Sequence, residues 1–69
     1  MALRRLNGLT SPAAGVEVTI YRDSENQEFV VKLAGNPAAD YFTDDRQDAT
    51  STALDMFTRA VDEVCAILS

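Results

Sequence analysis

Residues 16–22, Val-Glu-Val-Thr-Ile-Tyr-Arg, decide the fold class because their side chains alternate along the chain. A period of two places the valines and the isoleucine on one face of an extended segment, which is the pattern of a half-buried β-strand. The polar residues 23–27 follow as a turn, and residues 29–33 then alternate in the same way. The sequence therefore predicts an antiparallel hairpin.

The chain after the hairpin predicts one more strand and one long helix. Gly35-Asn36-Pro37 ends the second strand, and residues 39–42 predict a short third strand that extends the meander. Thr43 or Asp44 is expected to cap a helix over residues 45–68, because Asp44 and Gln47 have the spacing of a capping box. Apolar residues at steps of three and four predict a wide stripe that packs on the sheet: Ala53, Leu54, Phe57, Ala60, Val61, Val64, Cys65 and Leu68.

The predicted helix is too long for the predicted sheet. Over residues 45–68 it would extend about 36 Å at about 1.5 Å per residue, which exceeds the length of a three-stranded meander. We therefore expect its last turns to curl, to dock against the N-terminal segment or to contact another chain. Ahead of the hairpin, Leu3 and Leu6 stand at a helical step before Asn7-Gly8 and predict one short helical turn. Residues 10–15 are expected to form a linker.

These elements predict an α+β fold in the order αβββα: a short N-terminal helical turn, a three-stranded antiparallel meander and one long C-terminal helix packed on one sheet face. We expect a single domain, in which residues 1–15 are an N-terminal segment and residues 16–69 hold the meander and the helix. The order resembles that of the double-stranded RNA-binding domain, in which the start of the final helix carries a Lys-rich phosphate-binding motif. Asp44, Asp45 and Asp48 stand at that place here, so repulsion opposes RNA binding.

The negative charge of the chain is concentrated in its C-terminal part. The formal net charge is −5, and residues 40–69 hold seven of the eleven acidic residues against Arg46 and Arg59. Residues 1–39 hold four acidic and four basic residues. Such a one-sided field repels nucleic acid and anionic membranes and attracts surfaces rich in Lys and Arg. The sequence therefore predicts a basic protein as the partner, with no direct binding to nucleic acid or to a membrane.

Four acidic residues form one row on the predicted helix. At about 100° per residue, Asp44, Asp48, Asp55 and Asp62 fall within about 40° of one another, opposite the apolar stripe. Carboxylates in the first turn have a structural explanation, because they stabilise the helix dipole. Asp62 and Glu63 have no such explanation, because negative charge near the C-terminal end opposes the dipole.

We interpret the acidic row as a surface that imitates a line of phosphates and binds a basic groove on another protein. Lasting affinity would also need an apolar anchor, for which Tyr21, Tyr41 and Phe42 are candidates. The predicted partner-binding residues are those of the helix together with two from the hairpin turn: Asp44, Asp45, Asp48, Asp55, Asp62, Glu63, Glu25 and Glu28.

The sequence holds no pattern that predicts catalysis, a cofactor or a metal ion. It has no His, one Cys and no Gly-rich phosphate-binding loop. Asp40, Asp44, Asp45 and Asp48 do not have the spacing of a calcium-binding loop. Cys65 has no His to activate it and is expected to be a small buried apolar residue. We therefore expect a protein that is not an enzyme.

A very small, acidic, cysteine-poor αβ chain with no catalytic motif resembles the anti-CRISPR proteins of phages, which include DNA mimics and inhibitors of type I effector complexes. The resemblance covers size, charge and architecture, and it implies a non-enzymatic inhibitor in the cytoplasm of a bacterial host, as a monomer or weak homodimer. The alternative is a homo-oligomeric structural or antitoxin-like interaction protein. It would pair two chains through the apolar end of the helix, at Val61, Val64, Ile67 and Leu68.

Overall fold

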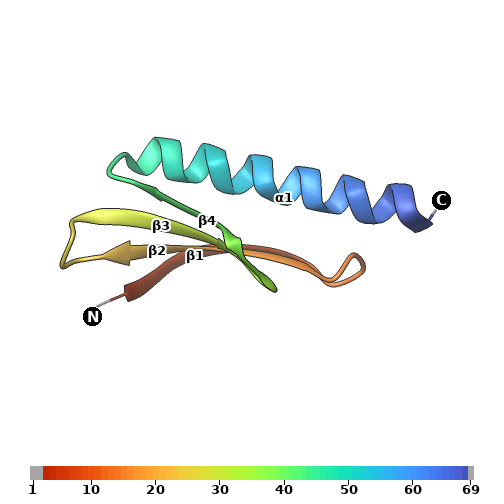
Figure 1. Ribbon diagram of the computed structural model, residues 1–69, viewed down its shortest axis with the longest axis horizontal. Coiled ribbons are helices and arrows are strands. Elements are labelled where there is room, and N and C mark those ends of the chain that lie inside the picture. The colour runs from red at the N-terminus through yellow and green to blue at the C-terminus, as the bar shows by residue number, and fades with distance from the viewer. Residues whose placement is uncertain (1–2, 69) are drawn as a thin grey trace.

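The computed structural model describes residues 3–68 as a four-stranded antiparallel sheet with one helix across one of its faces (Figure 1). The strands follow one another in space in the order of the sequence, so each pairs with its neighbour in the chain. The described part of the chain measures 43 × 20 × 19 Å. The elements are β1 (Leu3–Ser11), β2 (Val16–Asp23), β3 (Glu28–Leu33), β4 (Asn36–Thr43) and α1 (Arg46–Leu68).

The predicted order αβββα is wrong, because the sheet has four strands instead of three and its first strand, Leu3–Ser11, stands where a helical turn was expected. Leu3–Ser11 pairs along β2, from Leu3 opposite Asp23 to Ser11 opposite Val16. The register shifts between Arg5 and Asn7, so Leu6 is an extra residue in a β-bulge. A bulge disturbs the period of two, which explains why the spacing of Leu3 and Leu6 imitated a helix. The order ββββα also removes the basis for the resemblance to the double-stranded RNA-binding domain.

The segment expected to be a linker is the end of β1 followed by a tight turn. The amide of Ala14 donates to the carbonyl oxygen of Ser11 at 3.2 Å, and the amide of Gly15 donates to that of Pro12 at 3.3 Å. Gly15 has a φ of 67°, a left-handed conformation that glycine adopts without steric cost. This turn lets residues 3–11 fold back on β2 as a hairpin.

The other predicted strands lie inside observed ones. Residues 16–22 fall in β2 and residues 29–33 fall in β3, which begins one residue earlier. The short strand expected at residues 39–42 extends over Asn36–Thr43. Its pairing with β3 is irregular, with a register shift between Val31 and Leu33, and it contains Pro37. Both features suit an edge strand, because proline cannot donate to a neighbouring strand.

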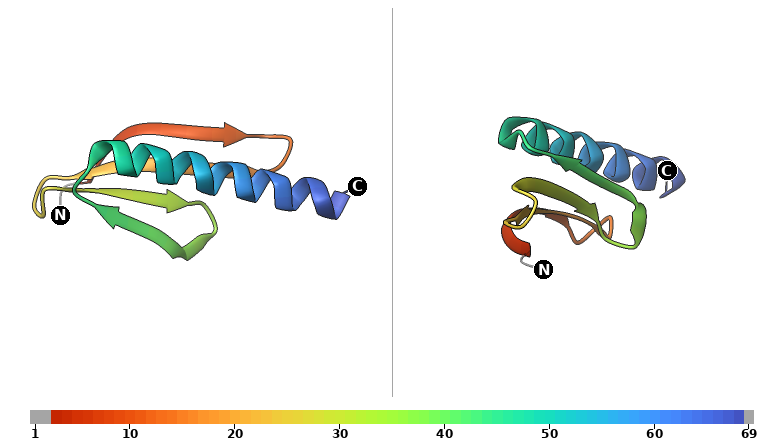
Figure 2. Two further views of the ribbon diagram at one scale, coloured as in Figure 1. Left: turned by 90° about the horizontal axis from the view of Figure 1, so that it is seen from above. Right: turned by 60° about the vertical axis from the view of Figure 1, so that its left-hand side comes forward.

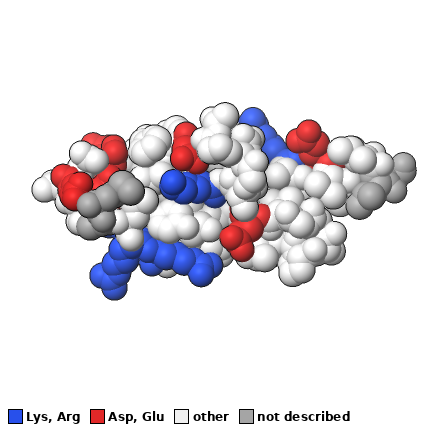
Figure 3. Space-filling view, turned by 60° about the horizontal axis from the view of Figure 1, so that its bottom comes forward, with Lys and Arg blue, Asp and Glu red and all other residues white. Residues whose placement is uncertain are grey.

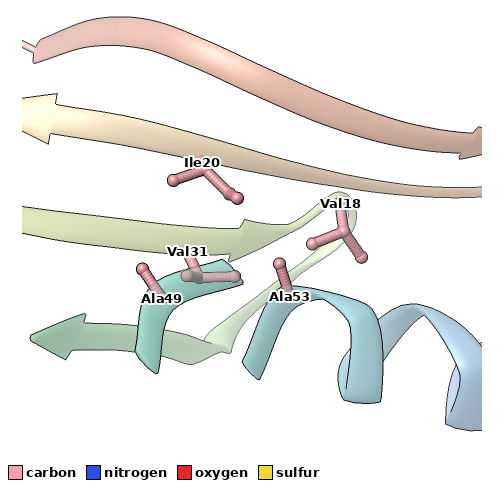
Figure 4. Packing of buried hydrophobic residues seen from close by; sticks show 5 residues of the cluster. All are labelled: Val18, Ile20, Val31, Ala49 and Ala53. Carbon is pink, nitrogen blue, oxygen red and sulfur yellow. The ribbon is translucent and has the colours of Figure 1, made fainter. Parts of the chain in front are cut away.

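The core lies between the middle of the sheet and the first half of α1. Val18, Ile20 and Val31 extend from β2 and β3 toward Ala49 and Ala53, which are 0% and 1% exposed (Figure 4). The two alanines allow the helix backbone to approach the sheet closely. The predicted apolar stripe is only partly correct. Met56 packs against this core, whereas Leu54 and Cys65 are exposed.

The helix begins one residue later than the predicted capping box implies. The Asp45 carboxylate accepts the amide of Gln47 at 2.9 Å and that of Asp48 at 3.4 Å, so Asp45 is the N-cap. The Asp45 amide in turn donates to the hydroxyl oxygen of Thr43 at 3.2 Å. Thr43 and Asp44 therefore precede the cap, and the expected pairing of Asp44 with Gln47 is wrong.

The last turns of α1 extend past the β1–β2 turn (Figures 1 and 2). Val61, Val64 and Cys65 line a hollow of about 200 Å³ together with Ser11, Ala13 and Ala14 of that turn. Ile67, farther along, is 76% exposed. Of the three expectations for the overlong helix, partial docking against the N-terminal hairpin is the one observed in a single chain.

Candidate functional site

The eight predicted partner-binding residues do not form one continuous surface. Asp44, Asp45 and the β2–β3 turn with Glu25 and Glu28 lie at one end of the molecule, where α1 begins (Figure 1). Asp62 and Glu63 lie near the opposite end of the helix. Asp48 and Asp55 stand between the two ends, and each has a specific polar partner described below.

Asp48 is not part of an outward-facing row. Its carboxylate accepts a hydrogen bond of 2.7 Å from the Tyr41 hydroxyl of β4, and its side chain is half-buried. This hydrogen bond, together with one from Thr43, lowers the pKa of Asp48 below its ordinary value of 3.8. The same bond raises the pKa of Tyr41 above its ordinary value of 10.0. Asp48 therefore fastens the helix to the edge of the sheet.

The side chains of Asp45 and Asp55 are exposed, but each interacts with another group of the same chain. Asp45 caps the helix through the two amides given above. Asp55 forms an ion pair with Arg59 one turn later, at 3.2 Å, with side chains 59% and 80% exposed. Exposed pairs of this kind are weak and easily exchanged for other partners. Asp55 thus keeps its carboxylate accessible to solvent.

Two carboxylates remain in line on the side of α1 away from the sheet. Asp55 and Asp62 are both exposed, and helical projection places them opposite the buried Ala49 and Ala53. We call these two residues the acidic helix face. Asp44 is also exposed, but it precedes the N-cap, so the helical period does not place it on this face. Asp55 and Asp62 are separated by about 10 Å along the axis. Glu63 is also exposed and flanks this line on the side of β4.

The β2–β3 turn is organised by Asp23, a residue that the sequence did not single out. Asp23 is 7% exposed and accepts the amides of Glu25 and Asn26 at 3.0 and 3.2 Å and the Asn26 side-chain amide at 2.9 Å. These bonds, led by the side chain of Asn26, lower the pKa of Asp23. The turn therefore holds Glu25 in an exposed position and Glu28 in a half-buried one.

The sheet face opposite the helix carries mixed charge and an aromatic row. Val30 pairs with Tyr21 on one side and Phe42 on the other, which explains why Val30 is only 1% exposed although no helix covers it. Nearby, Lys32 and Asp40 form an ion pair at 3.6 Å beside a shallow hollow of about 250 Å³. Figure 3 shows basic and acidic side chains interspersed on this side of the molecule.

The predicted aromatic anchors do not lie beside the acidic helix face. Tyr41 packs under the helix and donates to Asp48, whereas Tyr21 and Phe42 belong to the opposite face of the sheet. Phe42 is 56% exposed and is the most accessible of the three. A flat partner that covers the acidic helix face would not contact Phe42, because the sheet lies between them.

Within residues 3–68, no group of three or more Cys, Asp and Glu side chains is arranged to hold a metal ion. In the same part of the chain, no helix is both long and apolar enough to cross a membrane. Cys65 is exposed near Val61 and Val64 rather than buried as expected.

No protein-family model, curated protein or solved structure matches this chain.

Proposed function

We propose that this protein is a non-enzymatic inhibitor whose acidic helix face binds the basic, nucleic-acid-binding surface of another protein. The observation that carries the proposal is the separation of charge between the two layers of the fold. Residues 44–68 hold six carboxylates against two arginines, whereas residues 3–43 hold five carboxylates against four basic residues. A protein with such a one-sided field associates with cationic surfaces at an increased rate.

The position of Asp62 and Glu63 supports the same proposal. Both are exposed in the last turns of α1, where the helix dipole disfavours negative charge and no basic residue follows. A helix selected for stability alone would place Lys or Arg there. Carboxylates at this site cost stability, and binding of a cationic partner would offset that cost.

Two carboxylates that have partners within the chain are left out of the proposed contact surface. Asp45 and Asp48 serve the cap and the Tyr41 contact, so we propose the acidic helix face with Glu63 as the binding surface. Glu25 and Glu28 lie at the end where the helix begins and would contact only a partner that reaches around that end. The proposed setting is the cytoplasm of a bacterial host, and the resemblance to anti-CRISPR proteins makes a type I effector complex the first target to assay.

A competition experiment tests this proposal. A type I effector complex is bound to fluorescent double-stranded DNA at low salt, and increasing amounts of the protein are added. We expect the wild-type protein to displace DNA and the Asp55→Lys/Asp62→Lys/Glu63→Lys variant to displace it at least about tenfold less well. A control that reverses one charge on the other face of the sheet, Glu17→Lys, should compete like the wild type, and the single variant Asp62→Lys is its match on the acidic helix face. Equal competition by the triple variant would remove the acidic helix face from the mechanism.

The second candidate function is a homo-oligomeric structural or antitoxin-like protein that pairs two chains through the end of α1. The observation that favours it is Ile67, which is 76% exposed beyond the sheet. Light scattering across a dilution series tests this candidate. A dimer that Ile67→Lys dissociates would support it, and a mass independent of that substitution would exclude this surface.

A further inference from the structure

The flank of α1 that faces β1 carries no charge from Thr50 onward. Thr50 and Leu54 line a hollow with Asn7, Gly8 and Leu9 of β1, so this side of the helix is turned toward β1. Helical projection places Val61 and Cys65 on the same flank. The carboxylates of α1 point elsewhere: Asp48 binds Tyr41 of β4 on the opposite flank, and Asp55 and Asp62 face outward.

The edge strand beside this flank is also uncharged over much of its length. β1 is the first strand of the sheet, so its outer edge presents alternate N–H and C=O groups to solvent. Edge strands are usually protected by charged side chains, proline or a bulge. Arg4, Arg5 and the bulge at Leu6 protect the first half of β1, and the Arg5 guanidinium reaches as far as Gly8, whose amide donates to the Asn7 side chain at 2.8 Å. Residues 9–11, Leu-Thr-Ser, have neither a charged side chain nor a proline among them. The other edge, β4, contains Pro37 and an irregular register.

The uncovered area between β1 and α1 is apolar as well as uncharged. Seen from above, α1 runs over the middle of the sheet and leaves β1 at its side (Figure 2, left). Two hollows follow this boundary, one of about 120 Å³ beside Leu9 and Leu54 and one of about 200 Å³ beside Ala14 and Val61. Leu54 is 56% exposed within a single chain. We call residues 7–11 with Thr50, Leu54, Val61 and Cys65 the neutral seam.

We propose that a second copy of this chain binds at the neutral seam, with residues 7–11 of the two β1 strands paired antiparallel about a two-fold axis. An antiparallel edge is complementary to itself under such an axis, because each strand offers the other the same pattern of donors and acceptors. The axis stands perpendicular to the sheet, so the two four-stranded sheets become one continuous sheet with both helices on the same face.

A second copy supplies both an open strand edge and a matching apolar helix flank, which a foreign strand alone would not supply. Two chains of formal charge −5 repel each other over most of their surfaces. At the neutral seam they meet without opposing carboxylates, because Asp48, Asp55 and Asp62 point away from it. The pairing also brings Leu9 and Leu54 of each copy toward those of the other, which removes apolar surface from water.

The dimer would place both acidic helix faces on one side of the assembly. This consequence rests on the proposed function, since a surface with two such faces would cover a longer cationic groove than one chain can. The dimer itself does not depend on that function. A monomeric protein that still displaces DNA would overturn the dimer alone, and a dimer that displaces no DNA would overturn the proposed function alone.

Two measurements on the purified full chain test the dimer. Light scattering across a dilution series should give the mass of two chains at high concentration and of one chain at low concentration. Hydrogen exchange over the same series should show slower exchange with rising concentration for the amides of residues 7–11, with no change in β4. Leu54→Lys should raise the dissociation constant of the dimer on the order of tenfold.

Ser51→Lys is the matched control, since it makes the same charge on the exposed outer side of the same helix. We expect it to leave the dissociation constant unchanged, and circular dichroism should show that both variants are folded. The mass of one chain at all accessible concentrations would overturn the proposal. So would a dimer that protects β4 amides, or one that Ile67→Lys dissociates while Leu54→Lys does not.

Discussion

The two halves of α1 differ in what holds them. The first half is capped by Asp45, hydrogen-bonded through Asp48 to Tyr41, and buried through Ala49 and Ala53 against the sheet. The second half is half-buried at most, at Val61 and Val64, and ends with Ile67 exposed. The first half of the helix is therefore held against the sheet by packing and hydrogen bonds, whereas the second half has fewer contacts with the sheet.

The acidic residues of the two halves therefore have different effects on the stability of the helix. In the first half, acidic residues stabilise the chain, because they cap the helix and bind the Tyr41 hydroxyl. In the second half, Asp62 and Glu63 oppose the helix dipole and have exposed side chains. Acidic residues with the same formal charge are structural at one end of α1, and we propose that they are functional at the other.

The largest expected effect comes from enlarging an alanine in the first half. Ala53→Leu inserts a larger side chain where the helix contacts Val18 and Ile20, at a residue that is 1% exposed. We expect the free energy of unfolding to fall by roughly 1–3 kcal/mol, as overpacking does in other cores. Urea denaturation at neutral pH measures this change.

Ala66→Leu, the matched substitution in the second half, should change the free energy of unfolding by less than about 0.5 kcal/mol because Ala66 is exposed. Similar losses for both substitutions would mean that the second half is packed as firmly as the first, and the comparison would fail.

The next effect concerns the Tyr41–Asp48 hydrogen bond and depends on pH. Because the pKa of Asp48 is lowered in the folded chain, its stabilising contribution is present above the ordinary value of 3.8 and is lost as the pH falls through the lower folded value. Tyr41→Phe should lower the melting temperature by a few degrees at neutral pH and by less in acid, which thermal denaturation measures between about pH 7 and pH 3.

Tyr21→Phe, on the other face of the sheet, is the control for the loss of a tyrosine hydroxyl. Its effect on the melting temperature should be the same at both pH values. If Tyr41→Phe behaved in the same way, the hydrogen bond to Asp48 would contribute nothing to the attachment of the first half.

The smallest effect is expected for the ion pair in the middle of the helix. Arg59→Gln removes the 3.2 Å contact with Asp55. The Asp55 side chain is 59% exposed and the Arg59 side chain is 80% exposed. The free energy of unfolding should fall by at most about 0.5 kcal/mol, and less at high salt. Urea denaturation at two salt concentrations measures this, with Thr58→Gln as the control. A loss well above that value would place Asp55 among the structural carboxylates.

The sequence predicted the elements whose patterns are local and regular. Residues 16–22 alternate without interruption, and the long apolar stripe of residues 53–68 has no competing strand pattern. Residues 3–11 were mistaken for a helical turn and a linker because the bulge at Leu6 interrupts their alternation. The pairing partner of a strand is a non-local fact, and the tight turn at Gly15 that brings β1 back along β2 was itself expected to be part of a linker.

The residues of the candidate site also separate into those that the sequence could predict and those that it could not. Exposure of Asp55 and Asp62 follows from the helical period, so the sequence places them together. Asp44 was grouped with them wrongly, because it lies ahead of the N-cap and outside the helix. The contact between Tyr41 and Asp48 spans a strand, a connection and a helix start, and no periodicity encodes it. The neutral seam was missed because it depends on β1, which was not predicted as a strand.

One double variant tests most directly the proposal that acidic residues are structural at the first end of α1 and functional at the other. In Asp62→Lys/Glu63→Lys, positive charge complements the dipole, so the free energy of unfolding should rise by about 0.3–1 kcal/mol. The same variant should compete markedly less well for the basic DNA-binding complex at low salt. A protein that becomes more stable and loses competition supports the account. A protein that becomes more stable and competes as well as the wild type would contradict it.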